Sequence, residues 1–406
     1  MKLVVFCILT FSFLYRLALN IVQYRSCGNP IPENVSDIYD GETYEKWRRY
    51  SGEHCRLEII ATVLSLGISV VLLSTHAYAA VASLFDGGAF LQMLAVILLE
   101  VLIDAVASSV TGYYATMVIE EKYGFNRSSL KTFFTDQLRN LLIGLGLSLL
   151  LAWLLSVLHT ALGDWMILLF AVVVFCITLA ISFLYPIFSR IGNKFVPLEE
   201  GDLKNSLMEL LTKHGYQVKA IEVMDASRRT TKLNAYFTGF GKLKTIVLYD
   251  NLVNAMTTDE ICAVFSHELG HGLYKDVLKR QIMNFGNLLL MAVVVWLAVR
   301  DPRLHTAFGF ENVNYGFAYI LATIGLGLVQ PLIGMVMNAY SRYAEYRADQ
   351  QAVKEGYGSA MVTALKKLAK ENFAHLAPSS VNVLLEYSHP PLSQRIAKIE
   401  KDTSEF

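Results

Sequence analysis

Seven long apolar runs constrain this 406-residue chain more than any other feature of its sequence. A helix of about 20 apolar residues crosses a hydrocarbon layer ~30 Å thick. Helices buried in a soluble core are the alternative, but a run as dense as 166–185 leaves no polar face for water. The sequence therefore predicts a polytopic membrane protein with a seven-helix bundle. Five runs lie in the first half of the chain and two follow a polar gap: 3–22, 59–84, 90–118, 141–158, 166–185, 285–299 and 317–337.

The composition agrees with a chain that lies in a lipid bilayer. Hydrophobic residues make up 54% of it and charged residues 17%, whereas soluble domains carry about 25% charge. This excludes a disordered chain and argues against an ordinary cytosolic protein. Lys and Arg number 35, as do Asp and Glu, and nucleic-acid binding normally shows as a basic excess. We therefore expect the bilayer as a partner and no nucleic acid.

The first apolar run has two interpretations. It could be a secretory signal peptide that begins at the charged Lys2. Arg16 interrupts the run, however, and no convincing cleavage site of small residues closes it. We favour an uncleaved first helix, in which Arg16 reaches the interface or pairs inside the bundle.

Basic side chains in the short loops predict the orientation in the membrane. Loops rich in Lys and Arg face the cytosol. With seven spans, the basic loops lie on the same side as the polar segments 188–280 and 338–406. We expect these segments in the cytosol, at the endoplasmic reticulum membrane of a eukaryote or the cytoplasmic membrane of a bacterium. The basic side chains follow the first and third runs: Arg25, Lys46, Arg48, Arg49 and Arg56, then Lys122, Arg127, Lys131 and Arg139.

One short string in the first polar segment carries a metal-binding pattern. His267 and His271 are four residues apart, so both imidazoles face one side of a helix. Glu268 is offset by about 100° and can reach a water molecule without binding the metal. This is the His-Glu-x-x-His pattern of zinc proteases, in which the glutamate is the general base. A surface helix with two solvated histidines is the alternative, but Thr257 and Glu260 form a capping box that gives the helix a defined start.

A catalytic zinc needs a third protein ligand and an open position. Glu345 and Asp349 are also four residues apart in a helical pattern, so both can face one site. We expect Glu345 to bind zinc and Asp349 to accept the second ring N–H of a ligating histidine. The alternative is an exposed helix with ion pairs to Arg342 and Arg347.

These motifs together resemble the type I CAAX prenyl endopeptidases, which are seven-helix zinc metalloproteases of membranes. Two membrane runs lie between the His-Glu-x-x-His string and Glu345, as in that family, and the similarity extends over nearly the whole chain. Gly272 departs from the pattern, since many relatives carry a large residue there. Two further stretches resemble family segments: Asn234-Ala235-Tyr236-Phe237-Thr238-Gly239 and Ser388-His389-Pro390 with Arg395.

The resemblance implies roles for these two stretches. The first would line the cleft and pair with the substrate backbone, which makes Asn234, Ala235, Tyr236 and Gly239 substrate-binding residues. In the second, His389 would be catalytic through the developing oxyanion, and Arg395 would hold the substrate. One Zn²⁺ per chain would bind to the predicted ligands, lower the pKa of a water molecule and polarise the substrate carbonyl.

The resemblance also implies the organisation and the activity. The fold would be mainly α, with a zincin-type cytosolic metalloprotease domain that contains a small β-sheet. The expected activity is a zinc metalloendopeptidase that removes the C-terminal tripeptide of prenylated CAAX proteins or peptides. A related quality-control protease without prenyl dependence, and a non-enzymatic transporter or scaffold, are the alternatives. The expected parts are 1–187 with five spans, 188–282 with the metal-binding helix, 283–337 with spans six and seven, and 338–406, which completes the site.

Overall fold

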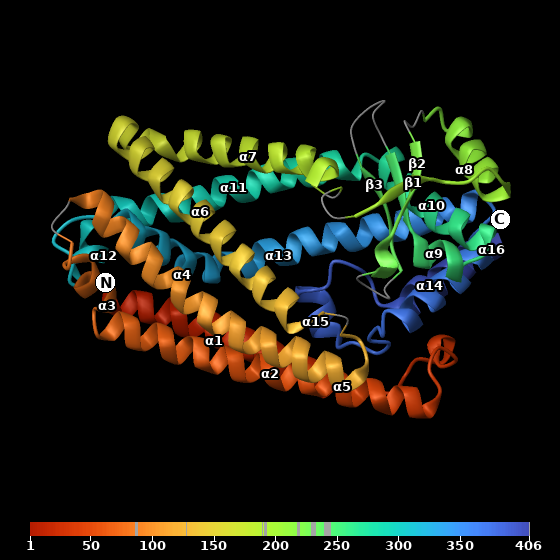
Figure 1. Ribbon diagram of the computed structural model, residues 1–406, viewed down its shortest axis with the longest axis horizontal. Helices are drawn as coiled ribbons and strands as arrows, with labels where there is room; N and C mark the ends of the chain where they lie inside the picture. The colour runs from red at the N-terminus through yellow and green to blue at the C-terminus, as the bar shows by residue number, and fades with distance from the viewer. Residues whose placement is uncertain are drawn as a thin grey trace. The chain divides into compact units, whose positions relative to one another are not determined.

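The protein is mainly helical, with one small sheet (Figure 1). Its fold follows from long apolar helices, which satisfy their backbone hydrogen bonds internally, and from shorter amphipathic elements between them. The computed structural model describes residues 1–85, 88–126, 128–188, 190, 193–216, 220–228, 233–238 and 245–405.

Six helical stretches within the described residues are long and apolar enough to cross a membrane. One of them, Leu130–Ser182, contains two of the seven apolar runs, because only a 3-10 turn, η3 (Gly163–Trp165), separates its two helices. Many exposed side chains on these stretches are large and apolar, which suits a lipid environment: Leu3 is 76% exposed and Val106 is 65% exposed. The main helices are α1 (Lys2–Ser26), α2 (Gly41–Ser74), α4 (Ala89–Tyr113), α6 (Leu130–Leu162), α7 (Met166–Phe188), α11 (Asp276–Arg300) and α13 (Tyr315–Lys354).

The chain forms two compact units. The second unit includes Arg25–Arg49, a segment far in sequence from the rest of that unit. The boundaries expected at 187, 282 and 337 stay a prediction. The first unit holds Met1–Tyr24, Tyr50–Cys176 and Met283–Gly334, and the second holds Arg25–Arg49, Ile177–Ile282 and Met335–Phe406.

The core of the first unit is aromatic and aliphatic. Phe308 and Phe317 are almost fully buried, with ring centroids 5.4 Å apart, and Val96 of α4 belongs to the same cluster. Short elements complete this unit: α3 (Ala77–Ala82), the π-helical turn η2 (Tyr114–Glu120), α5 (Glu121–Tyr123) and α12 (Pro302–Thr306).

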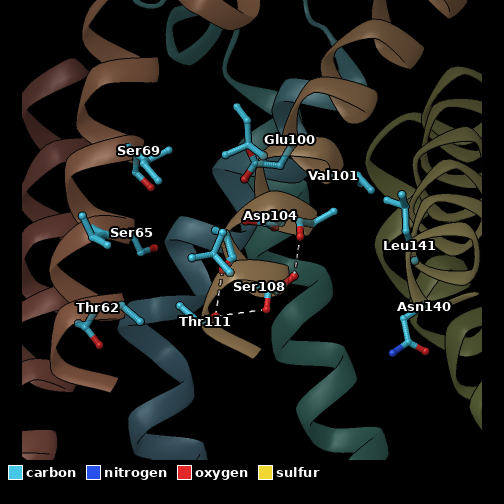
Figure 2. Close-up of a pocket in the computed structure, with 18 of the residues that line it drawn as sticks. Thr62, Ser65, Ser69, Glu100, Val101, Asp104, Ser108, Thr111, Asn140 and Leu141 are labelled. Carbon is cyan, nitrogen blue, oxygen red and sulfur yellow. Dashed lines mark hydrogen bonds between the residues drawn. The ribbon is translucent and has the colours of Figure 1, made fainter. Parts of the chain in front are cut away.

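A cavity of about 760 Å³, lined by both apolar and polar side chains, lies inside the first unit. Figure 2 shows Glu100 and Asp104 of α4 at this cavity, with Ser65 and Ser69 of α2 across from them. Arg16 of α1 also lines it, and Glu100 accepts a hydrogen bond from the hydroxyl of Tyr78. Charged side chains within membrane helices are costly unless they meet partners or water. The hydroxyl of Tyr78 gives Glu100 such a partner, and hydroxyl side chains line the same cavity as Asp104 and Arg16.

A four-stranded sheet forms one side of the second unit. Its strand order is β1-β2-β4-β3, with β2 and β4 parallel and the other two pairs antiparallel. The central strand β4 is buried, since Ile246, Val247 and Leu248 are each 1% exposed. The strands are β1 (Phe195–Pro197), β2 (Ala220–Met224), β3 (Ala235–Thr238) and β4 (Thr245–Tyr249).

Helices pack on this sheet and form the rest of the second unit. Leu207 and Leu211 of α8 join Phe265 of α10 in one buried cluster with the sheet residues. The helices and turns are α8 (Asp202–Lys213), η4 (Ala226–Arg228), α9 (Asp250–Ala255), α10 (Thr258–Leu273), α14 (Gly358–Glu371), α15 (Ser380–Leu385) and α16 (Leu392–Glu405).

The segment Arg25–Arg49 packs against the C-terminal helices of this unit. It contains the short turn η1 (Glu33–Val35), and Val35 is buried with Ile396 of α16. The Tyr39 hydroxyl lies 3.0 Å from two backbone carbonyl oxygens, those of Ala369 and Ala374. The Asn34 amide donates a 2.8 Å hydrogen bond to the carbonyl of Ser393. These contacts hold the beginning of α16, where the metal-site residue Arg395 lies.

Candidate metal centre

Helix α10 begins where the sequence predicts. The hydroxyl of Thr257 accepts a hydrogen bond from the backbone N–H of Glu260, at 3.3 Å, and the Glu260 carboxylate accepts one from the N–H of Thr257, at 2.8 Å. The predicted capping box is therefore confirmed. Lys367 lies 2.6 Å from the same carboxylate and adds a charge-assisted hydrogen bond. The start of the metal-binding helix is thus fixed.

Helix α10 and helix α13 approach each other closely. Helix α13 presents a row of small buried side chains, Ala344, Ala348 and Ala352. Gly270 of α10 faces this row, and a Cβ atom at this position would lie only 3.1 Å from the Cα of Ala348. Because Gly270 has no side chain, the two helices come close enough here for the carboxylates of α13 to reach the histidines of α10.

Three side chains converge as the sequence predicts. Glu345 Oε2 lies 3.4 Å from His267 Nε2, and Glu345 Oε1 lies 3.4 Å from His271 Nε2. One donor atom from each of the three residues lies within 4.8 Å of the others. Nitrogen and oxygen ligands about 2.0–2.1 Å from a tetrahedral zinc are about 3.3–3.4 Å apart. The spacing of these donors therefore fits one metal ion.

The electrostatics of the donor set also favour a cation. His267 is buried, and burial alone would lower its pKa. The nearby carboxylates of Asp349 and Glu345 instead raise the pKa of His267 to about 9. Positive charge is therefore stabilised at this point, and a divalent metal ion would satisfy the same field.

Asp349 lies behind His267, on the side away from the donor set. Its Oδ1 atom is 2.8 Å from His267 Nδ1, which is the geometry expected for a carboxylate that orients a ligating imidazole. Arg395 contacts both oxygens of Asp349, at 2.6 and 2.8 Å, and approaches Glu345 at 3.5 Å. Its guanidinium is thus engaged with Asp349, and a contact between Arg395 and substrate stays a prediction.

His389 lies at the exposed side of the site. Its Nε2 atom is 3.5 Å from Glu345 Oε1, and its Nδ1 atom is 2.9 Å from the hydroxyl of Ser388. Its side chain is 63% exposed, whereas that of Glu345 is 8% exposed. The structure therefore brings His389 next to the donor set and leaves it accessible.

Two comparisons by sequence bear on the family of this chain. Residues 20–190 match the family model described as CAAX prenyl protease N-terminal, five membrane helices. Residues 197–403 match the model for peptidase family M48. The chain belongs to the CAAX prenyl protease 1 family of M48 zinc metallopeptidases.

Individual relatives resemble this M48 metallopeptidase over most of its length. CAAX prenyl protease 1 of Saccharomyces cerevisiae is 29% identical, over 96% of this chain and 93% of the relative. A homolog from Arabidopsis thaliana is 31% identical, over 71% of this chain and 68% of the relative. The crystal structure of S. mikatae Ste24p superposes with a TM-score of 0.90 at 26% identity, covering 98% of this chain and 99% of that one. The predicted family and fold class are thus confirmed.

Part of the expected substrate-binding stretch of this metallopeptidase forms β3, which begins at Ala235. Ala235 and Tyr236 line a small cavity together with Glu268, the predicted general base. Strand β3 is at one end of the strand order. Asn234 is exposed, and its Oδ1 atom accepts a hydrogen bond from the N–H of Ala235. Gly239, the fourth predicted residue, lies outside the described residues.

The partner of His271 was not predicted from the sequence. Asp276 Oδ2 lies 3.1 Å from His271 Nδ1, and Asp276 is fully buried. Tyr340 and Arg347 of α13 contact its other oxygen. The available signal was an acidic residue five positions after the second histidine, directly after the metal-binding helix. The alternative for this segment was an exposed helix in which Arg347 forms a surface ion pair. Arg347 instead contacts the buried carboxylate of Asp276.

The departure at Gly272 has a structural explanation. A Cβ atom at Gly272 would lie 2.9 Å from the hydroxyl of Tyr216. Tyr216 packs against the core of the second unit. The small residue at 272 thus makes room for this tyrosine, and its effect concerns packing rather than the donor set.

Gly270 provides a direct test of the close helix approach. We expect Gly270→Ala to lower the stability of the protein by about 1–3 kcal/mol, because the new methyl group meets backbone atoms that cannot move freely. Thermal unfolding of the detergent-purified protein measures this effect. Gly286→Ala in α11 is the matched control, since nothing lies within 4 Å of its Cβ position and alanine is the better helix former. Equal stability of the two variants would contradict the packing argument.

Proposed function

We propose that this chain is a membrane zinc endopeptidase that removes the C-terminal tripeptide of prenylated CAAX proteins or peptides. The observation that carries the proposal is the convergence of His267, His271 and Glu345 beside Glu268. Similarity to CAAX prenyl protease 1 over nearly the whole chain supports the substrate class.

The donor set would hold one zinc ion, with Nε2 of each histidine and the carboxylate of Glu345 as ligands. Zinc in such a site supplies Lewis acidity that activates water and polarises a carbonyl. Asp349 would accept the Nδ1–H of His267 and thereby present Nε2 to the ion. Arg395 would keep Asp349 ionised and in place.

The remaining chemistry belongs to Glu268 and His389. Glu268 would take a proton from the attacking water and deliver it to the amine that leaves when the peptide bond breaks. His389 would donate a hydrogen bond to the oxyanion that develops on the substrate carbonyl. Its exposed position next to the donor set supports this role.

We propose that the substrate adds as an extended strand along β3. Ala235 and Tyr236 lie around the same small cavity as Glu268. A peptide at an edge strand gains backbone hydrogen bonds, and its alternate side chains reach pockets. Such a strand would carry its scissile bond toward the general base.

The chain is a multi-pass integral membrane protein, and we propose that its metal site faces the cytosol. The basic loops after the first and third apolar runs support this orientation. The membrane would be that of the endoplasmic reticulum in a eukaryote and the cytoplasmic membrane in a bacterium.

A matched pair of peptides tests the substrate class. One peptide ends in a prenylated Cys-aliphatic-aliphatic-x sequence, and the other has the same sequence without the prenyl group. We expect the purified protein to release the tripeptide with a higher kcat/KM from the prenylated peptide, measured by mass spectrometry. Equal values would favour the prenyl-independent quality-control protease. Cleavage of neither peptide by zinc-loaded protein would favour a scaffold or transporter.

A further inference from the structure

We propose that Asp276 is a positioning residue for the metal site, which it serves by fixing the orientation of His271. The inference rests on the proposed metal binding and extends it to three residues with no assigned role. These are Asp276 itself and its two partners on α13, Tyr340 and Arg347.

The carboxylate of Asp276 has a defined partner on each side. Oδ2 lies 3.1 Å from Nδ1 of His271. Oδ1 accepts a 2.8 Å hydrogen bond from the hydroxyl of Tyr340 and a further bond from the Arg347 guanidinium. Asp276 is 0% exposed, so the burial of its charge depends on these donors.

The local chain geometry explains how Asp276 reaches His271. Helix α10 ends at Leu273, and Lys275 has a φ of 56°, in the left-handed region. The N–H of Tyr274 bonds to the carbonyl of Gly270, which closes the last turn. The chain turns at Lys275, and α11 begins at Asp276. The side chain of Asp276 therefore points back to the last turn of α10.

The contact between Asp276 and His271 determines which ring nitrogen of the imidazole can bind a metal. One ring nitrogen of a neutral histidine carries a proton, and the other offers a lone pair to the metal. A hydrogen bond from Nδ1–H to Asp276 fixes the tautomer in which Nε2 carries the lone pair. That Nε2 atom lies 3.4 Å from Glu345 Oε1, so it faces the donor set. Asp276 thus selects both the proton position and the ring orientation of His271.

The same arrangement recurs behind the other histidine. His267 contacts Asp349, which is paired with Arg395, and His271 contacts Asp276, which is paired with Arg347. Two sets of side chains, each made of a histidine, an aspartate and an arginine in contact, thus support one group of metal donors. They differ in origin, because Asp349 lies on α13 and Asp276 begins α11.

Arg347 is itself held in place by aromatic rings. Its guanidinium carbon lies 4.3 Å from the ring centroid of Tyr274 and 5.1 Å from that of Tyr343. Cation–π contacts of this kind favour a fixed guanidinium position. A purely structural role for Asp276 is the competing explanation. In that case Asp276 would only neutralise the partly buried Arg347 and have no effect on the metal.

Zinc affinity of the full-length protein in detergent tests the positioning role. Competition with a chromogenic chelator gives the dissociation constant of zinc without any activity assay. We expect Asp276→Asn to weaken zinc binding by about 10–100-fold, the usual effect of losing an outer partner of a ligating histidine. Asp259→Asn changes an exposed carboxylate on α10, the helix that carries His271, and should leave the affinity unchanged.

A double variant separates positioning from neutralisation. Asp276→Asn alone leaves the partly buried Arg347 without its carboxylate, which should also lower the thermal stability. Combining it with Arg347→Met removes that unpaired charge. The inference holds if the double variant regains stability but keeps the weakened zinc affinity. It fails if the affinity returns together with the stability.

The outcomes also distinguish this inference from the proposed function. Wild-type protein that binds zinc stoichiometrically, together with an Asp276→Asn variant of equal affinity, would overturn the positioning role and leave the proposed enzyme intact. Wild-type protein that binds no zinc would overturn the proposed function, and the positioning role with it.

Discussion

Replacing Glu268 with glutamine should lower kcat for peptide hydrolysis by about 10²–10⁴-fold while leaving the zinc content unchanged. General acid–base catalysis contributes an effect of this size. Glu268 does not belong to the group of three donor residues, and it lines the small cavity beside β3 instead. Glutamine keeps the volume of the side chain but cannot accept a proton from water. The chemical step should therefore fail without loss of the metal.

Three measurements on the same preparation test this expectation. Zinc content is measured by elemental analysis, turnover by release of the tripeptide, and folding by thermal unfolding. Asp259→Asn changes an exposed carboxylate on the same helix and should keep full activity. Normal turnover in the Glu268→Gln variant would exclude Glu268 as the base. Loss of zinc from it would instead assign the residue to the binding of the metal.

Replacing Glu345 with alanine should weaken zinc binding by on the order of 1,000-fold. An outer partner of a ligating histidine is worth about 10–100-fold in affinity, and a direct ligand is worth more. The Glu345 carboxylate lies 3.4 Å from Nε2 of each histidine and supplies the negative charge of the donor set. The two histidines alone should bind zinc weakly.

Chelator competition measures the loss, and two further variants interpret it. Glu345→Gln retains the size of the side chain and removes its charge, so it should lose nearly as much affinity as alanine. Glu400→Gln, on the exposed side of α16, should bind zinc as the wild type does. Retention of tight zinc binding by Glu345→Ala would mean that another residue completes the site, and the proposed ligand set would then be wrong.

The features that the sequence predicted well are those with a local signal. The membrane helices can be recognised from apolar runs of sufficient length. In lipid the backbone must satisfy its own hydrogen bonds, so such a run is expected to form a continuous helix. The start of α10 was predictable from Thr257 and Glu260, since a capping box acts within one turn. The i, i+4 spacing of His267 and His271 predicts a shared helix face for the same reason.

The pairing of distant segments was predictable only in part. The i, i+4 pair Glu345 and Asp349 suggested a second helix face, and the resemblance to a family connected it to the histidines. The distance between α10 and α13 depends on Gly270 and Ala348, whose small size allows the two helices to approach closely. No periodicity in either helix reveals which small residues will face each other.

The sequence by itself determined the membrane helices, the metal-binding helix and its two histidines, because each depends on residues within a few turns of one another. Only the tertiary structure decided how the donors are supported. Asp276 reaches His271 because the chain turns at Lys275, and Arg395 reaches Asp349 because α16 contacts α13 at this point. Such contacts follow from helix packing and turns of the chain, which arise from the whole fold rather than from any single segment.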